Sequence, residues 1–106
     1  MVDEAFLASE LDKAAAFGSR HRVPVMVDQW GASRQAGPGR VQWVRDMARL
    51  LSEKRLHWTY WLGVEHYGNE SSGWGLVGER PGGGVWFDSP VLSELQAALA
   101  GTARGG

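Results

Sequence analysis

The sequence predicts an α/β fold in which three helices alternate with two parallel strands, in a single domain spanning residues 1–106. Two runs of aromatic and β-branched residues, VPVMVDQWG at Val23–Gly31 and HWTYWLGV at His57–Val64, have the composition of strands. Each run follows a segment whose apolar residues recur at helical spacing, which gives the order helix, strand, helix, strand, helix. A strand-helix-strand unit implies a parallel pair with a right-handed crossover.

The three predicted helices are amphipathic. The first extends from a cap at Asp3 to a stop at Gly18, and the second from Gly39 to about Arg55. The third begins at Ser89, and residues 101–106 are expected to form a loose tail. The predicted buried stripes are, in order, Phe6, Leu7, Leu11, Ala14 and Ala15; Val41, Val44, Met47, Ala48 and Leu51; and Val91, Leu92, Leu95 and Leu99.

The first strand has a recognisable direction and a polar end. Three valines and a methionine in five positions favour a strand covered on both faces, and Pro24 is tolerated only near the strand's start. The polar end is therefore the carboxyl end, where ligands bind in sheets with helical crossovers. Strand alternation predicts two faces, either of which could line a site: Val25, Val27 and Gln29 on one, and Met26, Asp28 and Trp30 on the other.

Residues 65–88 are rich in glycine and polar side chains and predict a loop on the side of the active site. Two short apolar segments interrupt it, Trp74–Val77 and Val85–Phe87. We expect these segments to form a small hairpin over the strand ends.

Composition excludes several classes of function. Eleven basic and twelve acidic residues give a formal charge of -1 without a basic stripe, which argues against a nucleic-acid partner. The chain has no run of 18 apolar residues and no signal-peptide pattern, so we expect a soluble protein without a membrane partner, and the compartment stays open. No metal or cofactor is expected, because the three histidines are scattered and the glycine-rich loops lack a phosphate-loop lysine.

Six tryptophans are many for 106 residues. A tryptophan either fills a core, which is the common case, or presents a flat apolar face on which a sugar ring can stack.

Four segments of the chain, in their order, resemble the last quarter of a cellulase-like glycoside hydrolase of family five. They are VPVMVDQWG, HWTYWLGV, SSGWGLV and the closing VWFDSPVLSEL. The resemblance implies the seventh and eighth strand-helix units of an eight-stranded (β/α) TIM barrel. It also implies β-linked oligo- or polysaccharide as the ligand. In that family the seventh strand ends in a nucleophilic glutamate, an aromatic residue and a glycine, which Gln29, Trp30 and Gly31 match here. A tryptophan closing the eighth strand forms the floor of a sugar subsite, and Trp61 matches it.

Glutamine at position 29 changes the expected chemistry. It has no anionic oxygen with which to attack an anomeric carbon, so we expect an inactive or solely carbohydrate-binding relative, with Trp30, Trp61, Trp74, Glu65 and His66 as candidate sugar contacts. The family's acid/base glutamate belongs to a part of the barrel that this chain does not contain.

Two alternatives stay open. A short active glycosidase would use Asp28 or Glu65 in place of Gln29. A non-enzymatic α/β module would use its tryptophans as core and would self-associate. Both sheet edges of a quarter barrel are open, so we expect completion by self-association, for instance of four copies. A chain that carries the rest of the barrel, or a rearranged monomer in which the region of Val85 pairs with one edge, would also cover the edges.

Overall fold

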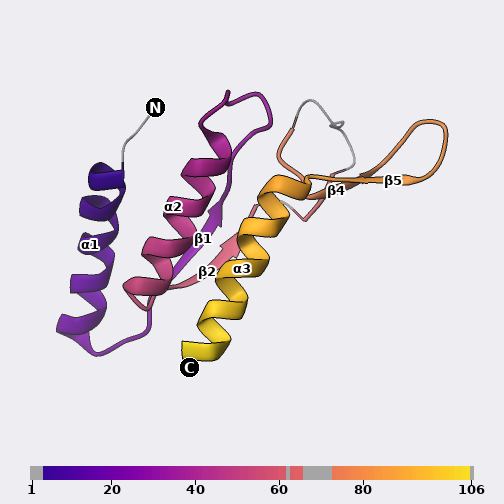
Figure 1. The fold of residues 1–106 in the computed structure, drawn as a ribbon. Helices are drawn as coiled ribbons and strands as arrows, with labels where there is room; N and C mark the ends of the chain where they lie inside the picture. Colours follow the sequence, from indigo (N-terminus) through magenta and orange to yellow (C-terminus); the bar gives the residue numbers. More distant parts are fainter. Residues whose placement is uncertain (1–3, 62, 66–72, 106) are drawn as a thin grey trace.

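The computed structural model describes residues 4–61, 63–65 and 73–105, except for the side chains of 64, 65 and 102–105. Three helices, α1 (Glu4–His21), α2 (Arg40–Glu53) and α3 (Ser89–Gly105), lie side by side over one face of a two-stranded sheet (Figure 1). The strands of this sheet, β1 (Met26–Trp30) and β2 (His57–Tyr60), are parallel, with Met26 opposite His57 and Val27 opposite Trp58. The predicted α/β class and the parallel strand pair are confirmed, and the arrangement is that of part of a TIM barrel.

A second small sheet extends away from the helices. It contains β3 (Val64–Glu65), β4 (Val77–Glu79) and β5 (Val85–Phe87), and β4 pairs in parallel with β3 and antiparallel with β5. β4 and β5 therefore form a hairpin, which projects to one side of the molecule (Figure 1). It contains the whole predicted segment Val85–Phe87, but only Val77 of the predicted segment Trp74–Val77. Gly78 packs against the Trp86 ring so closely that a Cβ on it would lie 2.3 Å from Cζ2, which ties the two strands together.

The core lies between the three helices and the face of β1 and β2 that they cover. Its centre is Val44, Leu51 and Val91, each almost wholly buried, from the predicted stripes of α2 and α3. Phe6 and Leu99, also predicted to be buried, are more than half exposed.

The other face of the two-stranded sheet is bare. Met26 is 59 % exposed, and Asp28, His57 and Thr59 are exposed beside it, whereas Trp58 and Tyr60 pack against the core. The prediction of a strand covered on both faces is therefore wrong for this chain. In a complete barrel this face would line the interior, where side chains from the other strands would pack on it.

Helix boundaries differ from the predictions at two places. α1 continues past Gly18 to His21, and α3 continues to Gly105 rather than giving way to a loose tail at Gly101. Gly18 serves packing instead, since a Cβ there would lie 3.0 Å from both the Val23 carbonyl oxygen and Val25 Cγ2.

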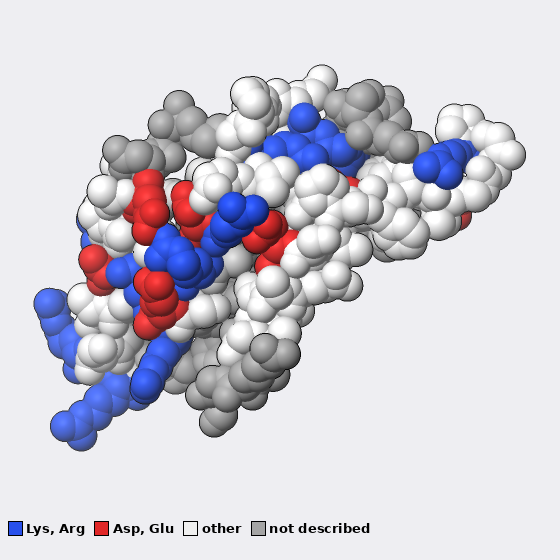
Figure 2. Space-filling model, viewed as in Figure 1, with Lys and Arg blue, Asp and Glu red and all other residues white. Residues whose placement is uncertain are grey.

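Ion pairs join neighbouring helices across their outer surfaces. Arg49 of α2 bonds Glu4 of α1, and Arg45 bonds Glu94 of α3 at 2.7 Å. Basic and acidic side chains intermingle over this part of the molecule (Figure 2). The bond from Arg45 lowers the pKa of Glu94.

Candidate functional site

The carboxyl ends of β1 and β2 are joined by their backbones. The Trp61 N–H donates to the Trp30 carbonyl oxygen at 2.8 Å, and the Gln29 N–H donates to Thr59 Oγ1 at 3.3 Å. Gln29 is exposed and Trp61 is 44 % exposed. The structure thus places these two predicted site residues on adjacent strand ends.

Gln29 has a backbone φ of 54°, in the left-handed region that residues with a Cβ seldom adopt. The β1–β2 register shifts between Val27 and Trp30, which is the mark of a bulge. The extra residue ends the strict alternation, so Trp30 shares the helix-covered side with Val25 and Val27. The predicted grouping of Trp30 with Met26 and Asp28 is therefore wrong.

Trp30 belongs to an aromatic cluster inside the core. It is 6 % exposed, and its ring centroid lies 5.1 Å from that of Tyr60, 5.5 Å from Trp58 and 6.0 Å from Trp43. Its Nε1 has no hydrogen-bond partner among the described atoms. With its faces covered in this way, Trp30 has no surface on which a sugar could stack.

Gly31 lets the chain pass directly over the end of β2. A Cβ built on it would lie 2.0 Å from the Trp61 carbonyl oxygen, closer than any real contact. The glycine that follows the Gln29–Trp30 pair is therefore required by the close approach of the two strand ends, and it fixes the backbone of Trp61.

Trp74, a third predicted contact, is also 44 % exposed, and Arg34 holds the chain on both sides of it. The Arg34 N–H donates to the Gly73 carbonyl oxygen at 2.8 Å, and its guanidinium donates to the Gly75 carbonyl oxygen. The same guanidinium lies 4.4 Å from the centroid of the buried Trp86 ring, as a cation–π contact. Sequence reasoning missed Arg34, because an arginine in an aperiodic loop gives no signal of its partners.

A buried ion pair anchors the helices that follow the strands. Arg40 at the start of α2 donates two hydrogen bonds, 2.9 and 3.0 Å long, to the carboxylate of Asp88, which directly precedes α3. Nearby, the Ala32 N–H donates to the Tyr60 hydroxyl at 3.3 Å, and burial raises the pKa of Tyr60. These contacts fix the loop after β1 against β2 and α3.

The chain is similar in fold to a protein of known structure. Over 88 % of its length it superposes on Cel5A of Thermotoga maritima, determined in complex with cellobiose, with a TM-score of 0.67 and 19 % sequence identity. The chain spans 27 % of the length of that protein. It matches no family model, and no curated protein matches it. At this identity the similarity concerns the fold, which is that of part of a (β/α) barrel.

The remaining predicted site residues are only partly described. The backbone of Glu65 lies in β3, while its side chain and all of His66 fall outside the described residues. Asp28 lies exposed on the bare sheet face next to Gln29 in the chain. Within the described ranges no three His, Asp or Glu side chains gather as a metal site would require, and none of the helices is long and apolar enough to cross a membrane.

Proposed function

We propose that this chain binds β-linked oligosaccharides at the carboxyl ends of β1 and β2 and does not hydrolyse them. The observation that carries the proposal is the exposed Trp61, held by its backbone beside the end of β1, where Gln29 is also exposed. The similarity in fold to a protein that binds cellobiose supports the choice of ligand.

Trp61 and Trp74 have the chemistry that a sugar platform needs. An indole ring offers a flat apolar face to the C–H groups of a pyranose, and it loses little conformational entropy on binding when its backbone is already fixed. The backbone at Trp61 is constrained by Gly31 and the bond to Trp30, and Trp74 is flanked by the two carbonyl groups that Arg34 binds. Gln29 can contribute amide hydrogen bonds to sugar hydroxyl groups.

The expected absence of hydrolysis follows from the chemistry of the glutamine at position 29. A retaining glycosidase requires two carboxyl groups about 5 Å apart, one of which attacks the anomeric carbon as an anion. Gln29 supplies neither charge nor ester chemistry. Loss of a nucleophile costs roughly 10⁴-fold or more in rate, so turnover by this chain should fall below detection.

A fluorescence titration with cellotetraose tests binding. We expect tryptophan emission of the unsubstituted chain to change saturably, and Trp61→Ala to weaken affinity about tenfold, the equivalent of about 1.4 kcal/mol. Phe17→Ala is the matched control, since Phe17 is an exposed aromatic residue on α1, away from the strand ends. Equal affinity in the Trp61 and Phe17 variants, or no saturable change at all, would rule out the proposed surface and favour a purely structural module.

A parallel assay with aryl β-glycosides tests the absence of hydrolysis. The unsubstituted chain and its Asp28→Ala variant should both be inert. Turnover by the chain that disappears in Asp28→Ala would show that Asp28 replaces the nucleophile. Turnover that appears only in Gln29→Glu would instead identify position 29 as the blocked nucleophile.

A further inference from the structure

Three exposed arginines lie at the amino ends of β1 and β2. Arg20 is in the last turn of α1, Arg22 follows that helix directly, and Arg55 lies between α2 and β2. The two strand starts are adjacent, because the His57 N–H donates to the Val25 carbonyl oxygen at 3.0 Å. The three arginines therefore belong to one end of the molecule, opposite to the proposed sugar site.

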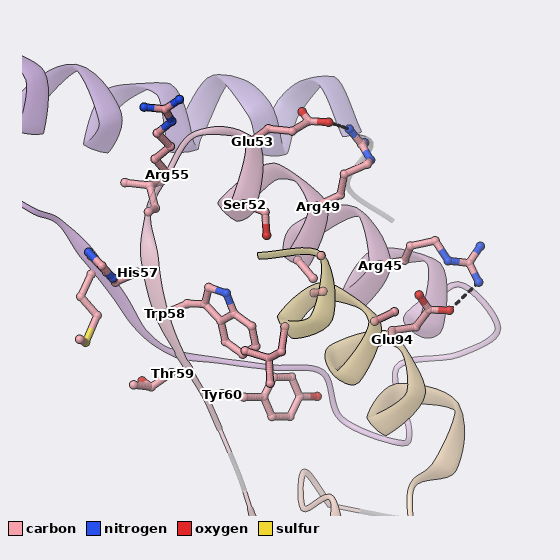
Figure 3. A pocket seen from close by; sticks show the side chains of 17 residues that line it. Arg45, Arg49, Ser52, Glu53, Arg55, His57, Trp58, Thr59, Tyr60 and Glu94 are labelled. Carbon is pink, nitrogen blue, oxygen red and sulfur yellow. Dashed lines mark hydrogen bonds and ion pairs between the residues drawn. The ribbon is translucent and has the colours of Figure 1, made fainter. Parts of the chain in front are cut away.

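No acidic side chain neutralises these arginines among the residues that the structure describes. Residues 13–27 contain no aspartate or glutamate. Glu53, two residues before Arg55, instead bonds Arg49 at 2.9 Å, and Figure 3 shows Arg55 pointing away from this pair. In Figure 2, basic side chains project outward at the lower left, where α1 ends, beyond the region in which the two signs intermingle.

The backbone gives a reason to assign a role to two of these side chains. Arg22 and Arg55 have φ values of 55° and 56°, a left-handed conformation that glycine adopts without a steric cost. The fold alone would therefore be served better by glycine at both positions. Strain retained at an exposed residue points to a function of its side chain.

Two exposed apolar side chains lie among the basic ones. Phe17 is 55 % exposed and precedes Arg20 by three residues, so both lie on the same side of α1, and its ring lies 4.3 Å from that of His21. Val23 is 45 % exposed and directly follows Arg22. Segments that bind at the surface of a bilayer combine apolar groups, which enter the headgroup region, with arginines that meet anionic lipids.

The position of the arginines favours a flat partner over a linear one. A groove lies between β2, α2 and α3, and it is lined by Arg55 but not by Arg20 or Arg22. A nucleic-acid strand or an acidic peptide lying in this groove would miss two of the three arginines. The end of α1 and its link to β1 form an extremity of the molecule (Figure 1), so a flat anionic surface can meet all three.

We infer that the amino ends of β1 and β2 dock on a bilayer that contains anionic lipids, with the arginines at the headgroups and Val23 in the interface. The formal charge of the chain is -1, so three unbalanced arginines leave the remainder net acidic, which orients this end toward the surface. The expectation of no membrane partner was derived from the lack of a long apolar run, which a peripheral contact does not require. The inference is independent of sugar binding, since it uses the opposite ends of the strands.

Sedimentation with sucrose-loaded vesicles tests this inference. The vesicles contain equal parts of phosphatidylserine and phosphatidylcholine, or phosphatidylcholine alone. We expect the unsubstituted chain to bind only the vesicles with phosphatidylserine, and added salt to weaken the binding. Arg22→Gly and Arg55→Gly should each lower the partition coefficient about fivefold. Both variants should resist urea at least as well as the unsubstituted chain, so unfolding cannot explain their loss of binding.

Two further variants separate this surface from net charge. Lys13→Ala is the matched control, because it removes a positive charge that is paired with Glu10 on α1, and it should leave the partition coefficient unchanged. Val23→Ser should lower the coefficient about threefold, because its polar side chain gains less from entering the interface.

Four results would overturn the inference. They are the absence of binding to phosphatidylserine vesicles, full binding by both glycine variants, an equal loss in Lys13→Ala, and no effect of Val23→Ser. Binding of a single-stranded oligonucleotide or of polyglutamate by a chain that does not bind the vesicles would assign this end to a soluble polyanion and would also overturn it.

Discussion

One residue, Gln29, determines how the tryptophans near the strand ends are divided between core and surface. Its left-handed backbone inserts a bulge, which turns Trp30 into the aromatic cluster and leaves Gln29 exposed. A left-handed residue with a Cβ costs roughly 1 to 2 kcal/mol, and such positions are enriched at binding and catalytic sites. The strained residue here is also the one that the sequence resemblance assigns to the nucleophile position.

Gly31→Ala should be among the most damaging single substitutions in this chain. The added Cβ would collide with the Trp61 carbonyl oxygen, whose position is fixed by the bond to Trp30, and relief requires the two strand ends to separate. We expect a loss of about 3 kcal/mol in the free energy of urea unfolding. Gly63→Ala is the control, because a Cβ at Gly63 meets nothing within 4 Å among the residues that the structure describes. Similar stability of the two variants would contradict this account.

Arg34→Met should release the chain around Trp74 while keeping a side chain of similar length. The variant loses the guanidinium bond to Gly75 and the cation–π contact with Trp86. We expect the signal of Trp74 to respond less to cellotetraose, and the affinity to fall about three- to tenfold. The response of Trp61 to the sugar should change little. Arg20→Met, on the exposed end of α1, provides the control. Unchanged affinity in Arg34→Met would show that Trp74 needs no such support.

At the scale of elements, α1 and α2 end in the same way before their strands. Arg22 and Arg55 have φ values of 55° and 56°, and the following residues donate to carbonyl groups one turn back, Val23 to Gly18 at 3.1 Å and Leu56 to Leu51 at 2.9 Å. These are Schellman motifs in which arginine occupies the position that glycine prefers. Each motif turns the chain directly into a strand.

Arg22→Gly should therefore stabilise the protein by about 0.5 to 1 kcal/mol, because glycine adopts the left-handed conformation without a steric cost. Ala16→Gly, on the exposed face inside the same helix, should have the opposite effect, a loss of about 1 kcal/mol. Both are measured by urea denaturation. Destabilisation by Arg22→Gly would mean that the arginine side chain contributes more than its backbone costs.

The sequence predicts the order of the elements well, because helical spacing and β-branched runs are local signals. α2, for instance, buries the predicted residues Val44 and Leu51. The side of the sheet on which Trp30 lies was not predictable. It depends on the bulge at Gln29, and the residue type at that position does not indicate a bulge. The end of α1 was not predictable either. Gly18 suggests a helix stop but allows close packing, and the left-handed Arg22 ends the helix instead. Arg34 and Asp88 acquire their roles only through partners distant in sequence.

The molecule as a whole is elongated rather than compact. Its radius of gyration is 15.1 Å, against about 13 Å for a compact chain of roughly 100 residues, and its extents are 52 × 29 × 21 Å. The hairpin of β4 and β5 projects from one side of the molecule, and the face of β1 and β2 opposite the helices is bare (Figure 1). Stability in isolation therefore rests on the helical side alone.

We propose that Trp61 and Trp74 bind sugar, whereas Trp30, Trp58 and Trp86 are held in the packed interior. Fluorine NMR of the chain labelled with 5-fluorotryptophan tests it most directly, with each resonance assigned by a single Trp→Phe substitution. On addition of cellotetraose we expect the resonances of Trp61 and Trp74 to shift saturably and those of Trp30, Trp58 and Trp86 to stay in place. A shift of Trp30 without Trp61, or no shift in any resonance, would contradict the account.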